Sequence, residues 1–492
     1  MNGPVGKAVS DDLSEAVTYP VDAFISREYA QAEPERLWSK VWQQAGRVEE
    51  LKQVGDYITY NICHDSILIV RDTPETLRAF HNVCPHRGRR LVGNNTGGGP
   101  KTVAQDTGAH SAKGNRLRFS CNYHAWTFDL DGSAEHIPDA EDWGGMLDHV
   151  CTSLTPVQVD TWGGWIWINM DMEAGPLREW LEPAASLLDP FQFEAMRYRF
   201  RQWGIFDCNW KVALEAFLEA YHVQGTHPQL MKYGDFYSFS RVIGMHSQTG
   251  FDSKEKREAS AAATSVHRAA GEDDPRYTIA KMQAEFWETI GGSTTETLVK
   301  AAQRLPEELP EGTPAAEVHR HWLESARRDD AARGVDWPEI SDREMAAAGL
   351  AVALFPNMNL IPGPTFSLYY RVRPYGTDPD KCIFEAVALD RFPEGEEPET
   401  EWTYAEQDLS QWPHVIAQDI SNMVEVQRGY KSQGFKGNLP NPWQERKVTN
   451  LHRNLARYMD AGAPTPIPGP SDATEHSRLS EIKEGAQNAE HS

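Results

Sequence analysis

The stretch "NVCPHRGRRL" (Asn82–Leu91), read together with "SCNYHAWTF" (Ser120–Phe128), decides the fold of the N-terminal part of this chain. Each stretch carries one cysteine followed closely by one histidine: Cys84, His86, Cys121 and His124. The segments around them are short, rich in β-branched and aromatic residues, and interrupted by Gly, Asp and Asn. This pattern predicts a small antiparallel β domain over residues 45–165 that presents two thiolates and two imidazoles from two loops.

Two metal centres would accept these four ligands. A structural zinc ion takes two Cys and two His in a tetrahedron. A Rieske [2Fe–2S] cluster takes two Cys on one iron and two His on the other. The order of the ligands favours the cluster, because each loop supplies one Cys and one His and can contact both irons. The remaining alternative is a coincidence of two buried cysteines and two histidines with ordinary partners.

Composition excludes several function classes. Among 492 residues, 40% are hydrophobic and 24% are charged, which is ordinary for a globular chain. The net charge of -24 argues against nucleic acid or an anionic membrane as partner. No run approaches the ~18 apolar residues of a membrane span, and the first residues lack the apolar core of a signal peptide. Six cysteines make no disulfide framework in so long a chain, so we expect a cytoplasmic location.

The rest of the chain predicts an α+β protein with a second, catalytic domain. We expect this domain to combine an antiparallel sheet with helices and to comprise residues 19–44 and 166–455. Helical patterns occupy residues 20–45, 205–224, 253–348 and 413–430, the third as an insert and the fourth as the last helix. The polar termini, residues 1–18 and 460–492, are expected to be disordered.

A second metal site is indicated by "NWKVALEAFLEAYHVQGTHPQL" (Asn209–Leu230). Apolar residues from Trp210 onward recur at helical spacing, and Glu215, Glu219 and His222 form a polar stripe beside them. Side chains five apart on a regular helix diverge by roughly 140°. We therefore expect Gly225 to end the helix, so that the chain curls back and brings His227 near His222. Two histidines that cap a helix end are the alternative reading.

Two histidines need a carboxylate to complete a 2-His-1-carboxylate iron site. The helix predicted over 413–430 offers Asp419, which lies beside its apolar face. A carboxylate directed toward a core is costly unless it is paired or binds a metal. An ordinary helix acid remains the alternative.

These motifs resemble those of the Rieske non-heme iron oxygenases, in particular the large α subunit of the aromatic-ring-hydroxylating dioxygenase family. The family pattern C-x-H-R-G and C-x-Y-H-G-W is matched at Cys84–Gly88 and Cys121–Trp126, except that Ala125 stands where glycine is usual. The separation over residues 87–120 is also longer than usual. The resemblance implies an all-β Rieske domain followed by a helix-grip catalytic domain. It also implies a [2Fe–2S] cluster on Cys84, His86, Cys121 and His124, and Fe(2+) on His222, His227 and Asp419.

The resemblance further gives Glu219 a role between the two metal centres of neighbouring subunits, where it would hydrogen-bond a ligand histidine on each side. Glu215 is then structural, either solvated or paired. The implied activity is hydroxylation, by O₂ and relayed electrons, of an apolar substrate, aromatic or polycyclic. The implied partners are a ferredoxin or flavin reductase, two further copies in a homotrimer, and a small β subunit in some members. A Rieske O- or N-demethylase, a Rieske electron carrier without oxygenase activity, and a structural or sensory iron protein remain alternatives.

Overall fold

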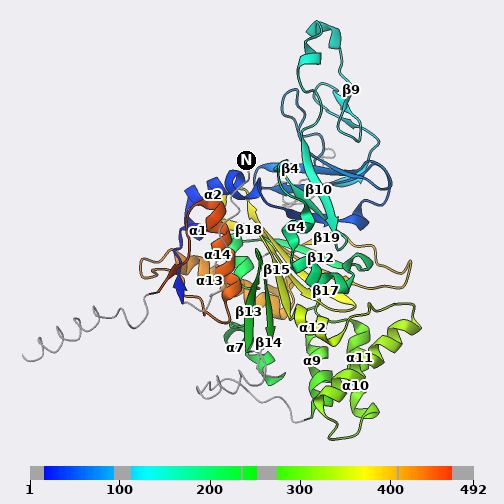
Figure 1. Cartoon of the computed structure of the whole chain (residues 1–492), viewed down its shortest axis with the longest axis vertical. Coiled ribbons are helices and arrows are strands. Elements are labelled where there is room, and N and C mark those ends of the chain that lie inside the picture. The colour runs from blue at the N-terminus through cyan, green and yellow to red at the C-terminus, as the bar shows by residue number, and fades with distance from the viewer. Residues whose placement is uncertain (1–15, 94–111, 234–236, 252–273, 407–408, 468–492) are drawn as a thin grey trace, which may run out of the picture.

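The computed structural model describes residues 16–93, 112–233, 237–251, 274–406 and 409–467. Figure 1 shows two regions: a β-rich region that carries strands β4, β9 and β10, and a larger region in which helices surround a second sheet. This arrangement confirms the α+β class and the expected order of an N-terminal β domain and a catalytic domain. The long loop over 87–120 is described only in part.

The N-terminal region is built from antiparallel strands. Its main sheet has seven strands in the order β2-β11-β10-β5-β4-β3-β6. Their bounds are Gln43–Arg47 (β2), Trp165–Asn169 (β11), Pro156–Trp162 (β10), Leu77–His81 (β5), Asp65–Arg71 (β4), Asp56–Ile62 (β3) and Lys113–Asn115 (β6). A smaller sheet of three strands, β7-β8-β9, carries the second Cys–His loop. Its strands are Phe119–Ser120, Thr127–Phe128 and Ala134–His136.

The main N-terminal sheet is buried on both faces. Side chains alternate between the faces of a strand, and here Leu68 and Val70 pack with Cys84 and Cys121 in one cluster. On the opposite face of the same strand, Ile67 and Ile69 belong to the core shared with the catalytic region. The two regions are therefore joined by a continuous apolar core, not by a linker.

The catalytic sheet has eight strands in the order β13-β14-β15-β16-β17-β18-β12-β19. Their bounds are Ser238–Ile243, His246–Phe251, Ala351–Leu354, Met358–Pro362, Phe366–Tyr375, Asp378–Asp390, Arg197–Phe206 and Trp402–Tyr404. All neighbours pair antiparallel except β12 and β19, which are parallel. Helix α13 (His414–Tyr430) packs its apolar face, which includes Ile416 and Ile420, into the same core as Tyr370 and Phe384 of the sheet.

The remaining helices cover the sheet and form the insert. Short helices α4 (Leu177–Leu181), α5 (Ala184–Leu188), α6 (Trp210–Glu215) and α7 (Val223–Thr226) lie between strands. The insert comprises α9 (Pro275–Thr289), α10 (Glu296–Glu308), α11 (Ala315–Ala332) and α12 (Asp342–Ala348). Residues 253–273 of the predicted insert lie outside the described residues. Within the described ranges, no helix is both long and apolar enough to span a membrane.

Four sequence-based expectations were wrong in detail. The helix predicted over 20–45 consists of α1 (Asp22–Ile25), α2 (Arg27–Glu33) and a π-helical turn that ends at Trp38, followed by β2. Residues 197–206 form β12, and the helix predicted over 205–224 is interrupted. Helix α13 is not the last, because α14 (Arg446–Met459) follows it. The termini are not wholly unstructured, since β1 (Val17–Thr18) pairs with β20 (Thr465–Pro466).

A buried charged triad stabilises the middle of the catalytic sheet. Glu385 on β18 accepts hydrogen bonds from Arg371 (2.5 and 2.9 Å) and Arg373 (2.9 Å) on β17. Burial alone would raise the pKa of Glu385, but the two guanidinium groups lower it from 4.5 to about 2. The lowered pKa means that the triad stabilises the fold above pH 4.5 and that this contribution is lost as the pH falls through 2.

We expect Glu385→Gln to reduce the free energy of unfolding at neutral pH by about 3–5 kcal/mol, because two buried cations lose their counter-charge. Denaturant unfolding at several pH values measures this. The difference from wild type should shrink between pH 4.5 and 2. The matched control is Glu425→Gln, which breaks an exposed pair with Arg428 and should change stability by less than about 0.5 kcal/mol. If the difference in the free energy of unfolding between wild type and Glu385→Gln stays constant down to pH 2, the lowered pKa of Glu385 is wrong.

Candidate functional site

The segment that carries the candidate metal ligands is anchored at its first three residues. The Asn209 side chain caps α6 by accepting from the Lys211 backbone N–H (3.1 Å). Trp210 donates its indole N–H to Glu33 (3.0 Å), and Lys211 forms an ion pair with the same carboxylate (2.5 Å). Lys211 and Glu33 are 0% and 2% exposed. These buried bonds fix where α6 begins relative to α2.

Helix α6 then ends much earlier than the sequence pattern predicts. It stops at Glu215, and residues 216–221 form turns closed by hydrogen bonds such as Phe217 N–H to Leu214 C=O (3.0 Å). His222 directly precedes α7, and His227 directly follows it. Gly225 lies inside α7 and does not end the helix, so the expected left-handed turn at this glycine was wrong.

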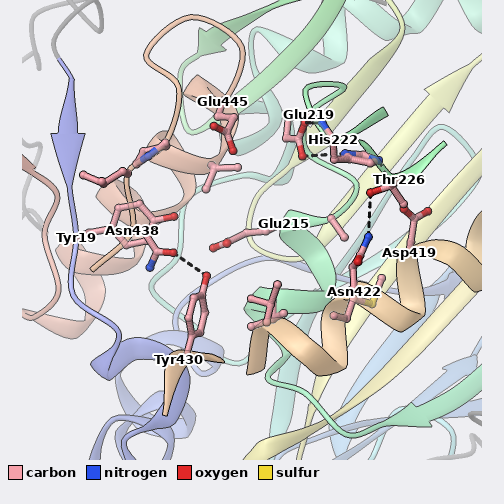
Figure 2. Close-up of a pocket in the computed structure, with 17 residues that line it drawn as sticks. Tyr19, Glu215, Glu219, His222, Thr226, Asp419, Asn422, Tyr430, Asn438 and Glu445 are labelled. Atoms are coloured by element: carbon pink, nitrogen blue, oxygen red, sulfur yellow. Dashed lines mark hydrogen bonds and ion pairs between the residues drawn. The ribbon is translucent and has the colours of Figure 1, made fainter. Parts of the chain in front are cut away.

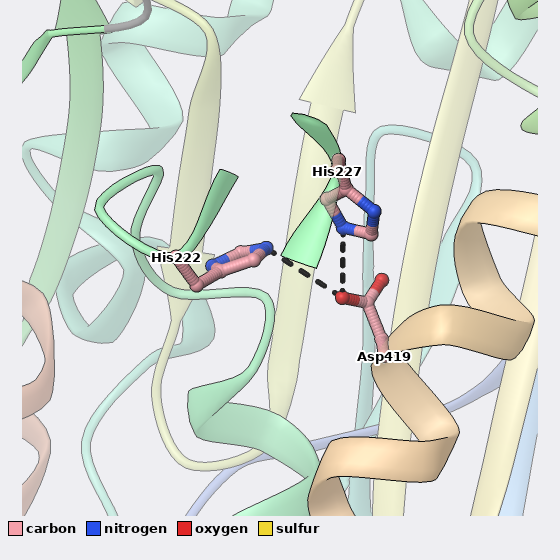
Figure 3. Close-up of side chains that lie close together, drawn as sticks. All are labelled: His222, His227 and Asp419. Carbon is pink, nitrogen blue, oxygen red and sulfur yellow. Dashed lines mark hydrogen bonds and ion pairs between the residues drawn. The ribbon is translucent and has the colours of Figure 1, made fainter. Parts of the chain in front are cut away.

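The structure brings together the three residues predicted to hold iron. The Nε2 atoms of both histidines approach Oδ1 of Asp419, at 3.5 Å from His222 and 2.9 Å from His227 (Figure 3). One potential ligand atom from each residue lies within 4.8 Å of the other two. Asp419 is 4% exposed on α13. Three converging donors from separate elements are the arrangement that a divalent metal ion with open coordination positions requires.

The outer ring nitrogens of the two histidines have different partners. His222 donates from Nδ1 to Glu219 Oε1 (2.8 Å), and its backbone N–H donates to Glu219 Oε2 (2.9 Å). His227 donates from Nδ1 to the amide oxygen of Gln418 (2.9 Å). Burial alone would lower the pKa of His222, but the Glu219 carboxylate raises it to about 9. Sequence reasoning found Glu219 and missed Gln418, although Gln418 directly precedes Asp419.

A pocket of about 350 Å³ opens beside this centre and reaches His222 and Asp419. Figure 2 shows Glu215, Glu219 and Glu445 pointing into it, with Tyr19 and Tyr430 on the opposite side. Glu215 is paired with His452, which agrees with the structural role expected for it. Burial together with the nearby Glu219 and Glu215 carboxylates raises the pKa of Glu445 to about 7. The pocket thus gathers three glutamate carboxyl groups, which makes it electronegative and suits a guest that brings N–H donors or positive charge.

The two Cys–His loops have closely similar backbones. Each closes with a hydrogen bond from the residue four after its cysteine, from Gly88 N–H to Cys84 C=O and from Ala125 N–H to Cys121 C=O, both 2.9 Å. Both cysteines are buried, and the rings of His86 and His124 lie 4.6 Å apart. The buried Nδ1 of His124 has no hydrogen-bond partner among the described residues. Two buried thiols and an unpaired ring nitrogen fit a metal cluster better than an apolar core.

Ala125 occupies a left-handed backbone conformation, with φ of 58°. Gly88, at the corresponding position of the first loop, has φ of 71°. The left-handed region costs an L-residue such as alanine roughly 1 kcal/mol, which explains why glycine is the expected residue there. The departure at Ala125 strains the loop locally, while the loop keeps the same closing hydrogen bond as its counterpart at Gly88.

Two family profiles match this chain. The profile described as "Rieske [2Fe-2S] domain" matches residues 41–156, and the one described as "Ring hydroxylating alpha subunit (catalytic domain)" matches residues 188–461. The donor sets above lie one in each matched region. A Rieske cluster and a mononuclear iron are the cofactors of these domains.

Sequence relatives and solved structures point to the same family. The chain is 32% identical over 215 residues to the carnitine monooxygenase oxygenase subunit of Acinetobacter pittii, covering 43% of this chain and 53% of that protein. It is 28% identical over 232 residues to the glycine betaine monooxygenase oxygenase subunit of Pseudomonas aeruginosa, covering 46% and 50%. These matches span only about half the length of each relative.

Similar folds occur in the quaternary ammonium Rieske monooxygenase CntA bound to L-carnitine (TM-score 0.58, 19% identity, 92% of this chain and 100% of that one). They also occur in a naphthalene 1,2-dioxygenase mutant bound to phenanthrene (TM-score 0.59, 17% identity, 91% and 93%). The catalytic-domain profile alone covers more than half of the residues. The chain therefore belongs to the family of Rieske-type ring-hydroxylating oxygenase α subunits.

Proposed function

We propose that His222, His227 and Asp419 hold the mononuclear iron of this terminal oxygenase, and that Cys84, His86, Cys121 and His124 hold its Rieske cluster. The observation that carries the first assignment is the convergence of both Nε2 atoms on Asp419. When bound, the cluster supplies single electrons and the iron supplies O₂ activation. The alternative function, a Rieske electron carrier without oxygenase activity, would need no second metal centre. The convergence of these three side chains argues against it.

We infer that the two centres work between copies of the chain. In Figure 1 strand β9, next to the cluster loops, and helix α7, next to His222, lie far apart along the long axis. The loop tips are open to a partner: Tyr123 is 52% exposed, and Arg87 lies over its ring. The electronegative pocket at Glu219 complements these imidazoles and the guanidinium group. Glu219, already bonded to His222, would accept the second imidazole N–H and orient both rings.

This proposal accords with a similar structure, that of a quaternary ammonium Rieske monooxygenase for which inter-subunit electron transfer is described. The homotrimer, the ferredoxin or flavin reductase and the cytoplasmic location remain predictions from the resemblance. At least two copies are required by the electron route proposed here.

The reaction we propose is hydroxylation of a C–H bond: R–H + O₂ + 2e⁻ + 2H⁺ gives R–OH + H₂O. For the substrate we propose a quaternary ammonium compound, because the relatives named above act on carnitine and glycine betaine. The net charge of -24 would also raise the local concentration of a cationic substrate.

The apolar aromatic substrate predicted from the sequence is the second candidate. The segments that carry His222, His227 and Asp419 also contribute a buried apolar cluster, which includes Val223, Leu230, Met231 and Val415, with Phe286 of the insert packed against it. Apolar side chains so near in sequence to the proposed ligands would suit an aromatic ring. Trp322 of the insert packs in a separate core that the insert forms for itself.

Asp419→Ala should remove the mononuclear iron and leave the cluster, because the two histidines lose the carboxylate on which both of their Nε2 atoms converge. Iron and sulfide analysis should show one iron fewer per chain than wild type and unchanged sulfide. The Rieske electron-spin-resonance signal serves as the control for folding. Full iron content in the variant would refute the ligand assignment.

Glu219→Gln should leave both metal centres filled and slow product formation by about an order of magnitude or more, because the amide loses the negative charge and replaces one of the two acceptor oxygens with an NH₂ donor. Glu215→Gln is the matched control, since Glu215 lines the same pocket but bonds to His452. Cluster reduction by a generic reductase should be normal in both. Loss of iron from Glu219→Gln would make Glu219 a ligand, and normal turnover would remove it from the electron route.

Substrate class is tested with L-carnitine, glycine betaine and choline against indole and naphthalene. The wild-type enzyme with a generic reductase should couple O₂ uptake to product only with members of the first set. If hydroxylated product forms from indole or naphthalene and from none of the quaternary ammonium compounds, the substrate is of the apolar class.

A further inference from the structure

The histidine ligand that lies deepest in the protein is held by a pair of glutamine side chains. His227 is 2% exposed, and its Nδ1–H donates to Gln418 Oε1 at 2.9 Å. Gln229 donates from Nε2 to the same oxygen at 2.7 Å, and Gln418 donates back to Gln229 at 3.5 Å. Two donors on one oxygen define which way the Gln418 amide faces. The Gln418 amide, which is itself held in place by Gln229, therefore keeps the proton of His227 on Nδ1. The other ring nitrogen, Nε2, is left without a proton and faces Asp419.

The two histidines of the proposed iron site thus differ in the charge of the group that accepts the hydrogen bond from Nδ1. His222, whose side chain is 24% exposed and lines the pocket, has the Glu219 carboxylate as acceptor. His227 has a neutral amide. Asp419 and Glu219 already place two negative charges around the centre, and a third carboxylate behind His227 would favour the ferric over the ferrous ion, since Coulomb attraction grows with the charge of the ion.

We propose that Gln418, oriented by Gln229, is a positioning residue that fixes the tautomer of His227 and keeps this side of the iron site uncharged, so that the iron stays reducible. The inference rests on the proposed iron site. It adds that the neutrality of the amide matters as well as its shape. The acceptor orients the ring, and its lack of charge sets the balance between the two oxidation states.

Three variants separate these two effects. Gln418→Met keeps the length of the side chain and removes the acceptor. Gln418→Glu keeps an acceptor and adds charge. Gln229→Met leaves Gln418 in place but frees its amide to turn. The matched control is Asn422→Ala, because Asn422 lies on the same helix and joins it to Thr226 (2.9 Å) without contacting a ligand.

The first measurement is Fe(2+) affinity by competition with a chromogenic chelator under nitrogen. Gln418→Met should lose about 10–100-fold, the range typical for groups that orient metal-bound histidines. Gln229→Met should lose less, and Gln418→Glu and Asn422→Ala should bind within about threefold of wild type or more tightly. Wild-type affinity in Gln418→Met would overturn the orienting role.

The second measurement is a redox titration of the ferric electron-spin-resonance signal. Gln418→Glu should shift the iron to a lower potential, while the Rieske signal and its potential stay unchanged. An unshifted iron potential in Gln418→Glu would overturn the charge argument. If the wild-type chain binds its cluster but no further iron, the proposed iron site fails and this inference fails with it. If the wild-type chain binds the additional iron and the Gln418 variants match it in affinity and potential, the iron site stands and only this inference is wrong.

Discussion

The proposed iron site depends on one constraint: the helix that begins at Trp210 has to stop after Glu215. On a continuous helix, histidines five residues apart would point in directions roughly 140° apart. Because the chain turns over residues 216–221 and restarts as α7, His222 lies before the short helix and His227 after it. Both have left the regular helical path, so their rings can face the same carboxylate. Glu219 stabilises the restart, since its carboxylate accepts the His222 backbone N–H as well as the ring N–H.

Helix α13 ties this interrupted segment to its third ligand. The helix supplies Asp419 to the proposed metal site and Gln418 to His227, and two turns later Gln427 accepts from the Asn209 backbone N–H at 3.1 Å. Asn209 is also the cap of α6. The start of the ligand segment and its far end are therefore both held by the same helix. Buried ion pairs such as Lys211–Glu33 then anchor these elements against α2.

The parts of this account that local patterns determine were predictable from sequence. The Cys–His loops are short turns whose ligands are separated by one or two residues, and α13 shows its apolar period directly. The break in α6 was not visible, because Phe217 and Leu218 continue the apolar period past the point where the helix ends. Helix α14 did carry an apolar stripe at helical spacing, Val448, Leu451, Leu455 and Met459, but polar residues such as Lys447, Asn450 and Asn454 are buried beside it and obscure the pattern. Strand β12 did carry a signal, since arginine alternates with other residues at positions 197, 199 and 201. The Gln418–Gln229 pair could not be predicted, because it joins residues 189 positions apart.

In the mechanism proposed above, an electron leaves the cluster of one copy and reaches the iron of another. The direct measurement co-assembles two defective chains: Asp419→Ala, which keeps a cluster, and Cys84→Ser/Cys121→Ser, which keeps only the iron. Electrons are supplied by a protein reductase, and the ferric electron-spin-resonance signal is followed. We expect that ferric iron is reduced in the mixed assembly and persists in assemblies of the cluster-free chain alone. Ferric iron that persists equally in both would contradict transfer between copies.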